Sequence, residues 1–242
     1  RADEGASLLH AAAEEGFEGN CTLSLKGADR DALDLGETTA LVWASELGRL
    51  AVVKTLLAAR ADASVREANN YSALDCAAEK GHHDVIKAIV GYGADVNASK
   101  DIQGVTPLTL AAHWSRCKAM AALLHYGGNA DVRDSGGNTP LHEACSEGRA
   151  GLEIMVNLLL RWGADETALN NDGRSPADAL DVENVRIIAP LDKIDRARRL
   201  LLSRAPADRA WRRRGWLVML RSRDSKAIVG GCWDNGGAAG AG

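Results

Sequence analysis

Short apolar stretches recur along the chain with the spacing of a single buried helix face. Two of these stripes are Val53, Leu56 and Leu57, and Ile86, Ile89 and Val90. Apolar residues at i, i+3 and i+4 indicate an amphipathic helix. Pairs of small residues, such as Ala77-Ala78 and Ala111-Ala112, mark a second set of helices that can approach one another closely. The pattern predicts an all-α chain of paired helices, in which no helix can bury its apolar face alone.

The helix pairs repeat with a period of about 33 residues. Leu41, Leu74, Leu108 and Leu141 lie 33, 34 and 33 residues apart, and each stands two positions after Thr or Ser. A hydroxyl at that position caps a helix, and a Pro after it costs no hydrogen bond because the first N–H is unpaired in any case. Degenerate copies of the unit flank the four clear ones, at residues 7–13 and 175–178.

Glycines are predicted to end both helices of a unit in the left-handed conformation. Gly48, Gly81 and Gly148 follow the first helices, and Gly93, Gly127 and Gly163 follow the second helices. Ser115 interrupts the first row and Arg60 the second.

Residues 139–145, Thr-Pro-Leu-His-Glu-Ala-Cys, resemble the ankyrin signature Thr-Pro-Leu-His-x-Ala-Ala, with Cys145 in the last Ala position. Residues 81–98 are similar to the second helix and exit turn of the same family. The resemblance covers residues 5–204. It implies an ankyrin-repeat solenoid of stacked helix-turn-helix units with short hairpin-like loops. About six units would occupy residues 1–204, the first and last degenerate, with an extra C-terminal capping helix at 193–203.

Composition and charge narrow the class of protein. With 46% hydrophobic and 26% charged residues, the chain is expected to be soluble and folded, and its longest apolar run falls far short of the ~20 residues that span a membrane. A net charge of -4 argues against nucleic acid as a general partner. The five cysteines have no paired spacing, which favours a reducing, intracellular setting. We favour the cytoplasm over the nucleus, because the Arg212–Arg214 run is better explained as a helix surface than as a nuclear import signal. Because the chain begins at Arg1, we expect either a processed protein or a piece of a longer one, and we favour the piece. If it is not part of a longer chain, the protein is expected to be a monomer.

The charge is unevenly distributed. Residues 1–192 hold 17 basic and 29 acidic residues, whereas residues 193–226 hold twelve basic and three acidic ones. Residues 205–226 are predicted to form a basic amphipathic helix, which either packs on the last repeat or engages a separate acidic surface. In the second case Trp211, Arg212, Arg213, Arg214 and Trp216 would contact an anionic membrane surface or calmodulin. The Gly/Ala-rich residues 227–242 are predicted to be disordered.

Signals for catalysis are weak. The His-Glu-Ala-Cys run at 142–145 superficially resembles the start of a zinc deaminase site, but no Pro-Cys-x-x-Cys follows it. Neither G-x-G-x-x-G nor G-x-x-x-x-G-K-[ST] occurs, and no cluster has metal-ligand spacing. His10 and His142 fall in the signature's His position, where the family resemblance implies hydrogen bonds to loop backbone. We therefore predict a non-catalytic protein without metal or cofactor.

The resemblance implies binding of a partner protein on the concave side, through loop tips and the outward positions of the first helices. Matching positions to the family pattern gives the candidate residues Arg66, Asn69, Tyr71, Glu79, Lys80, Gln103, Val105, His113, Trp114, Arg133, Asn138, Ser146, Glu147 and Arg174. Exposed Trp, Tyr and Arg most often dominate interface energy, which favours Trp114. The alternative is that Trp114 packs against Trp43 or a neighbouring loop. The predicted protein is an interaction scaffold or adaptor.

Overall fold

The computed structural model describes residues 2–24, 29–99, 103–146 and 151–180. Within these ranges the regular elements are α-helices, and the only extended pairings are isolated bridges, Leu33 with Thr39 and Arg66 with Ser72. Contacts group the chain into two compact units, residues 1–128 and 129–242.

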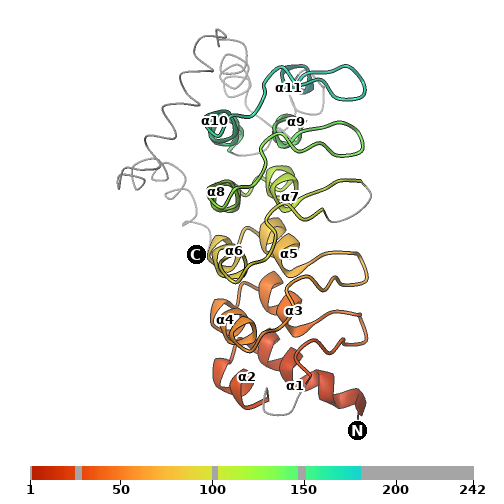
Figure 1. Cartoon of the computed structure of the whole chain (residues 1–242), viewed down its shortest axis with the longest axis vertical. Coiled ribbons are helices and arrows are strands. Elements are labelled where there is room, and N and C mark those ends of the chain that lie inside the picture. The colour runs from red at the N-terminus through yellow and green to blue at the C-terminus, as the bar shows by residue number, and fades with distance from the viewer. Residues whose placement is uncertain (1, 25–28, 100–102, 147–150, 181–242) are drawn as a thin grey trace, which may run out of the picture. The chain divides into compact units, whose positions relative to one another are not determined.

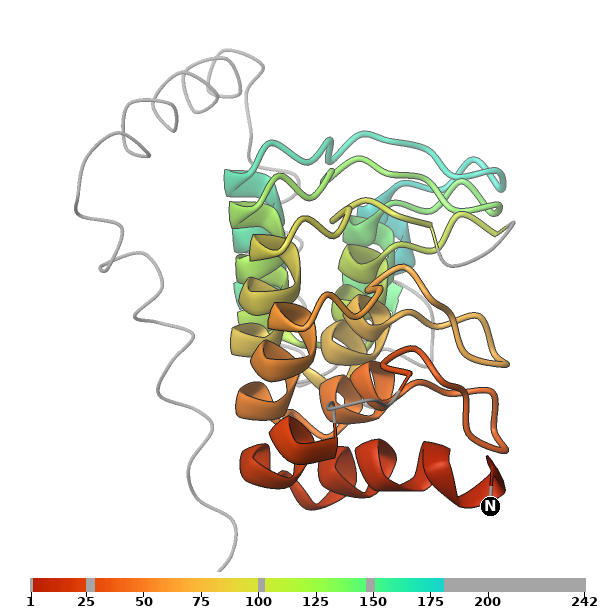
Figure 2. The same ribbon diagram turned by 60° about the horizontal axis from the view of Figure 1, so that its bottom comes forward.

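The first unit contains four described helix pairs, shown from two directions in Figures 1 and 2. Their bounds are α1 Ala2–Glu15, α2 Glu18–Ser24, α3 Ala40–Glu46, α4 Leu50–Ala58, α5 Ala73–Lys80, α6 His83–Gly91, α7 Pro107–His113 and α8 Cys117–His125. The odd-numbered helices pack against one another in one row, and the even-numbered helices form a second row behind them. Loops between pairs project beside the first row (Figure 2).

The second unit contains α9 Pro140–Ser146, α10 Leu152–Arg161 and α11 Pro176–Ala179. Helix α9 packs against both α10 and α11. The same alternation of first and second helices therefore continues within this unit.

The predicted caps are confirmed. Thr39, Ser72, Thr106 and Ser175 have extended backbone, and each side chain accepts a hydrogen bond from a backbone N–H in the first turn of the helix that follows. Pro107 and Pro176 occupy the first turn, where a missing N–H costs nothing.

The core consists of the predicted apolar stripes and alanines. Val53, Leu56 and Leu57 of α4 are buried, and Ala77, Ala78, Ala111 and Ala112 have no exposed surface. Ile86 and Ile89 are also buried, whereas Val90 is half-buried at the edge of its stripe. Alanines therefore form the close contacts along the first row, while larger aliphatic side chains fill the second.

The turns at the helix ends have left-handed backbone at the predicted glycine positions, including the two positions where another residue stands. Arg60 and Ser115 have φ of +66° and +56°, the same left-handed region that Gly93 and Gly81 occupy. Position in the repeat therefore fixes the backbone even when the residue is unfavourable there. Gly148, the capping helix at 193–203, the basic helix at 205–226 and the tail at 227–242 lie outside the described residues.

Candidate protein-interaction surface

The first row of helices carries a pocket of about 230 Å³ between α3 and α5. Its lining residues come from the two helices and from the loops that precede them: Thr38, Val42, Trp43, Glu46, Glu67, Asn69, Tyr71, Cys76, Glu79 and Lys80. The repeat explains this convergence, since equivalent loop and helix positions of adjacent units lie side by side when first helices stack.

Acidic groups dominate the charge of the pocket. Glu46, Glu67 and Glu79 contribute three carboxyl groups, and Lys80 contributes the only cation among the lining residues. The Lys80 Nζ lies 3.1 Å from Glu79 Oε1 and 3.2 Å from Glu46 Oε1. The hydrogen bond to Glu79 and the one to Glu46 raise the pKa of Lys80. The pocket therefore retains an excess of negative charge at neutral pH.

The Trp43 side chain, which lines the pocket, is held by a hydrogen bond to the loop that precedes α3. The Trp43 indole N–H donates to Asp34 Oδ2 at 2.8 Å. Burial opposes ionisation of Asp34, but hydrogen bonds from the Thr38 and Gly36 backbone and from Trp43 lower its pKa. An ionised Asp34 is a strong acceptor, so the Trp43 ring is oriented before any ligand arrives.

Cys76 lies at the base of the pocket and is buried. Burial raises the pKa of the Cys76 thiol, and the nearby carboxyl groups of Glu46 and Asp75 raise it further. A thiol that stays protonated is a poor nucleophile. Cys76 therefore contributes packing to this surface.

The structure brings four of the predicted binding residues together here: Asn69, Tyr71, Glu79 and Lys80. The sequence interpretation did not include Thr38, Trp43 and Glu46. Thr38 and Glu46 lie 33 positions before the predicted Tyr71 and Glu79, so extending those two positions one period toward the N-terminus identifies them. Trp43 corresponds to Cys76, which was not among the predicted residues, so the period does not identify it.

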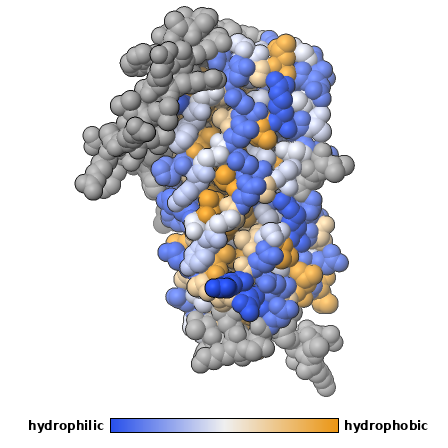
Figure 3. All heavy atoms as spheres, in the orientation of Figure 1, coloured by the Kyte–Doolittle hydropathy of each residue, from blue (hydrophilic) through white to orange (hydrophobic). Residues whose placement is uncertain are grey.

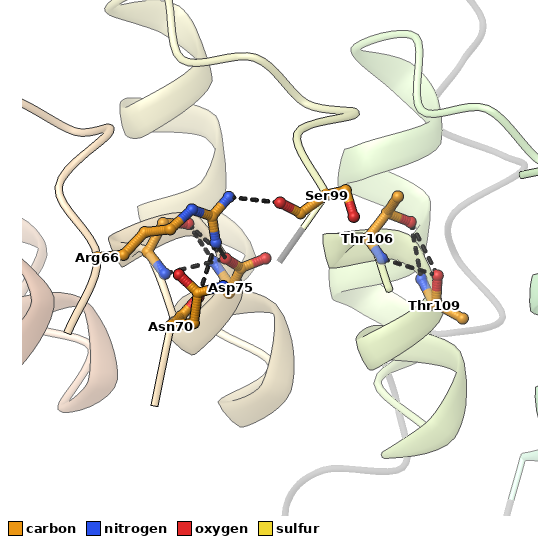
Figure 4. Close-up of polar contacts among 7 residues, drawn as sticks. Arg66, Asn70, Asp75, Ser99, Thr106 and Thr109 are labelled. Atoms are coloured by element: carbon orange, nitrogen blue, oxygen red, sulfur yellow. Dashed lines mark hydrogen bonds and ion pairs between the residues drawn. The ribbon is translucent and has the colours of Figure 1, made fainter. Parts of the chain in front are cut away.

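Arg66, also predicted to bind, is already engaged within the protein (Figure 4). Its Nη1 donates to Asn70 O at 2.8 Å and lies 3.0 Å from Asp75 Oδ2, and its Nη2 donates to Ser99 O at 2.8 Å. Burial raises the pKa of Asp75, whose side chain is fully enclosed. Arg66 thus links the α5 capping box to the loop of the following repeat.

The other predicted residues of the first unit lie one repeat further along. Gln103 is exposed, and Val105 and His113 are half-buried. Trp114 ends α7, has 36% of its surface exposed and contacts the His113 ring edge-on at a centroid distance of 5.4 Å. Trp43, its alternative packing partner from the sequence interpretation, lines the α3–α5 pocket instead.

In the second unit the predicted residues form hydrogen bonds with other residues of the same unit. Arg133 Nη1 donates to Leu169 O, and Asn138 Oδ1 accepts from Asn170 Nδ2. Ser146 Oγ donates to Glu143 O, and the Arg174 carbonyl accepts from His142. Glu147 lies outside the described residues.

The histidines at the His position of the signature form hydrogen bonds with backbone carbonyls, as the resemblance implies. His10 Nε2 lies 2.8 Å from Thr38 O, and His142 Nε2 lies 3.0 Å from Arg174 O. His142 and Cys145 are both buried, and Cys145 has no exposed surface. His142, Ala144 and Cys145 of the run at 142–145 therefore form part of the repeat's core, whereas Glu143 is half-buried.

Within the described ranges, no group of three or more His, Cys, Asp and Glu residues is placed to hold a metal ion. None of the helices described there combines the length and the apolar character needed to cross a membrane. In Figure 3 hydrophilic residues cover much of the coloured surface, and apolar residues form small separate patches between them.

Stacked helix pairs, loops on one side and a polar pocket between first helices define a helical repeat scaffold. The family model described as ankyrin repeats (3 copies) matches residues 8–100 and 97–170, more than half of the chain. The chain belongs to the ankyrin-repeat family.

Several relatives share this array. The chain is 35% identical over 145 residues to ankyrin repeat and KH domain-containing protein mask-1 of Caenorhabditis elegans, covering 60% of this chain and 5% of the relative. It is 33% identical over 105 residues to ankyrin repeat-containing protein P1E11.10 of Schizosaccharomyces pombe, 43% and 48% of the two chains. Human ankyrin repeat and SOCS box protein 6 is 31% identical over 144 residues, 57% and 34%. The chain thus spans less than half the length of these relatives.

Proposed function

We propose that this chain is a non-catalytic interaction module, a scaffold or adaptor that binds a partner protein through its loops and first helices. The observation that carries the proposal is the pocket between α3 and α5, where four residues chosen from repeat position alone converge with Trp43 and Glu46. Exposed Trp and Tyr side chains are enriched at protein interfaces, and Trp43 and Tyr71 both line this pocket.

The distribution of apolar contacts supports the same surface. The inner faces of the helices are buried in the stack, and Ala77, Ala78, Ala111 and Ala112 of the first row have no exposed area. Loop residues and the outward positions of α3, α5 and α7 are then the side chains available to a partner. The family consists of interaction modules in general, which agrees with this proposal.

We place the protein inside the cell, and in the cytoplasm rather than the nucleus. Cys21, Cys76 and Cys145 are free, buried thiols, which suits a reducing compartment. The Arg212–Arg214 run is better explained as part of a helix surface than as a nuclear import signal.

The alternative function places the activity in residues 205–226, which would present Trp211, Trp216 and Arg212–Arg214 to an anionic membrane or calmodulin. These residues lie outside the described structure. The charge contrast in the sequence motivates this alternative, and the same binding experiment tests it.

Affinity capture with mass spectrometry would identify a partner, whose binding to full-length variants is then measured by calorimetry. Tyr71→Ala with Trp114→Ala should weaken binding by about 2 kcal/mol, or about thirtyfold. Tyr92→Ala is the matched control, because Tyr92 is an exposed aromatic residue at the end of a second helix, α6.

Circular dichroism of each variant verifies that it is folded. If the Tyr71/Trp114 variant binds normally while Arg212→Gln with Arg213→Gln and Arg214→Gln abolishes binding, the C-terminal alternative replaces the proposed function.

A further inference from the structure

The pocket between α3 and α5 has a chemistry more specific than a general protein-binding surface. We propose that it is the anchor site for one arginine side chain of a partner protein. This inference rests on the proposed function and names the group that the pocket receives.

Charge is the first argument. Lys80 is shared between Glu46 and Glu79, so it offsets only part of their negative charge. Glu67 Oε2 accepts a hydrogen bond from Asn69 Nδ2 at 3.1 Å, a neutral donor that leaves the carboxylate charge in place. The neighbouring Arg66 does not neutralise Glu67, because its guanidinium is paired with Asp75. The lining residues therefore supply three carboxyl groups against one cation, Lys80.

Shape and aromatic content are the second argument. At about 230 Å³ the pocket is smaller than the ~300–1,000 Å³ of typical small-molecule sites, but it holds the volume of several water molecules at roughly 30 Å³ each. That size suits one long side chain. Trp43 and Tyr71 both line it, and a guanidinium group stacks well on such rings.

The arrangement of acceptors favours arginine over lysine. Glu46, Glu67 and Glu79 reach the pocket from two adjacent repeats, so a side chain bound there meets more than one carboxylate. A planar guanidinium carries five N–H donors and can serve several carboxylates at once, whereas an ammonium acts as a compact point charge. Lys80 already supplies that point charge.

The probe for this site is N-acetyl-arginine amide, titrated into the full chain while the Trp43 indole N–H resonance is followed by NMR. A Trp43→Phe variant assigns this resonance among the six tryptophans. The arginine probe should shift the Trp43 signal at millimolar concentration. The lysine analogue should bind several-fold more weakly, and the uncharged citrulline analogue should leave the signal unchanged.

Glu67→Gln should weaken arginine binding about threefold, the size of effect expected for one exposed ion pair. Asp172→Asn, which removes an exposed carboxylate in the second unit, is the matched control and should have no effect. Equal shifts with arginine and citrulline, equal binding of arginine and lysine, or an unaltered affinity of Glu67→Gln would each overturn the proposal.

A second occupant is tested in the same experiment. If Arg212→Gln, Arg213→Gln and Arg214→Gln by themselves move the Trp43 signal and increase affinity for the probe, the chain's own arginines fill the pocket and the separate partner is excluded. Partner binding that depends on Tyr71 and Trp114 while the arginine probe leaves Trp43 unmoved would defeat this inference alone and leave the proposed function standing.

Discussion

At the residue scale, one position of the repeat shows several chemical solutions to the same problem. In α5, α7 and α9 the third residue of the helix faces the backbone N–H of the cap residue. Asp75 Oδ2 accepts from Ser72 N at 2.9 Å, Thr109 Oγ1 from Thr106 N at 3.1 Å, and His142 Nδ1 from Thr139 N at 3.2 Å. A carboxylate, a hydroxyl and an imidazole are interchangeable here because each offers an acceptor at the required distance.

The choice of residue at this position also decides the link to the next repeat. His142 donates to Arg174 O through its second ring nitrogen, whereas Asp75 reaches Ser99 O through Arg66. The Thr109 side chain is too short to contact the next repeat in either of these two ways. The sequence variation at this position therefore changes contacts between repeats while the cap is preserved.

His142 makes stability depend on pH. Its Nδ1 accepts from the Thr139 backbone, so Nε2 carries the proton and donates to Arg174 O. Burial lowers the pKa of His142 below its ordinary value near 6.5. The unfolded chain then binds protons more readily, so this contribution to stability is complete above that ordinary value and is lost as pH falls through the folded-state pKa.

We therefore expect His142→Thr, which copies Thr109, to flatten the pH dependence of the unfolding free energy between pH 7.5 and 5. The variant should also lose about 1 kcal/mol at pH 7.5 with the Arg174 hydrogen bond. Urea denaturation at several pH values measures both effects. An unchanged slope would show that His142 does not titrate on unfolding.

Ser115 is a residue that its position disfavours. Its φ of +56° is left-handed, and its Oγ is buried with no hydrogen-bond partner among the described residues. Ser115→Gly removes the backbone strain and the buried hydroxyl, partly offset by the greater freedom of unfolded glycine. We expect a gain of about 1 kcal/mol in unfolding free energy by urea denaturation. Ser64→Gly, at an exposed loop position with ordinary φ, should bring no gain.

At the scale of elements, neighbouring repeats are joined by a recurring contact. The side chain just before α4, α6 and α8 reaches back to a carbonyl near the end of the first helix of the preceding repeat. Arg49 donates to Glu14 O, His82 to Glu46 O and Arg116 to Glu79 O, at 2.7–3.2 Å. Glu46 and Glu79 thus use their carbonyls for this contact and their carboxylates for the pocket, which couples the repeat junction to the binding surface.

A glycine stands beside each of these side chains. A Cβ added at Gly16, Gly48 or Gly81 would lie 2.9 Å from Arg49 Cδ, 2.7 Å from the His82 ring and 3.0 Å from Arg116 Cδ. The arginines are flexible and can shift, but the His82 ring is held by its bond to Glu46 O. Gly48 is therefore required for close approach as well as for its positive φ.

Gly48→Ala should therefore cost more stability than Gly93→Ala. Both positions have positive φ, but a Cβ at Gly93 meets nothing within 4 Å. The strained backbone at positive φ should lower the unfolding free energy of both alanine variants by about 1 kcal/mol. Crowding against the His82 ring should lower that of Gly48→Ala by at least about 1 kcal/mol more. In a His82→Ala background the excess should disappear, as a double-mutant cycle measured by urea denaturation would show. Equal losses for the two alanine variants would contradict this account.

At the scale of the whole molecule, periodicity was sufficient to predict the helices, caps and turns, because each of these depends on residues close in sequence. The period even placed Arg60 and Ser115 in glycine positions, where the structure keeps the left-handed turn. The family match over residues 8–170 agrees with that result.

The binding surface was less predictable, for physical reasons. Arg66 occupies a variable position, and nothing in the sequence shows that its guanidinium is used by a buried Asp75 nine residues later. The Trp43 ring was considered only as a packing partner, since its role depends on the Asp34 hydrogen bond and on α5 lying beside it. Repeat position predicts which side chains face outward, but not which of them are already engaged.

The glycine and the back-reaching side chain belong to different repeats yet must be kept together. A graft that exchanges one unit at the usual border, just before the Thr or Ser cap, would preserve every helix and still mismatch these two partners. Each glycine and its partner lie about one full period apart, as Gly48 and His82 or Gly81 and Arg116 do, so a one-unit graft separates such a pair wherever its borders are placed. A transplanted unit therefore fits its new neighbours only if the facing residue of each neighbour is exchanged with it.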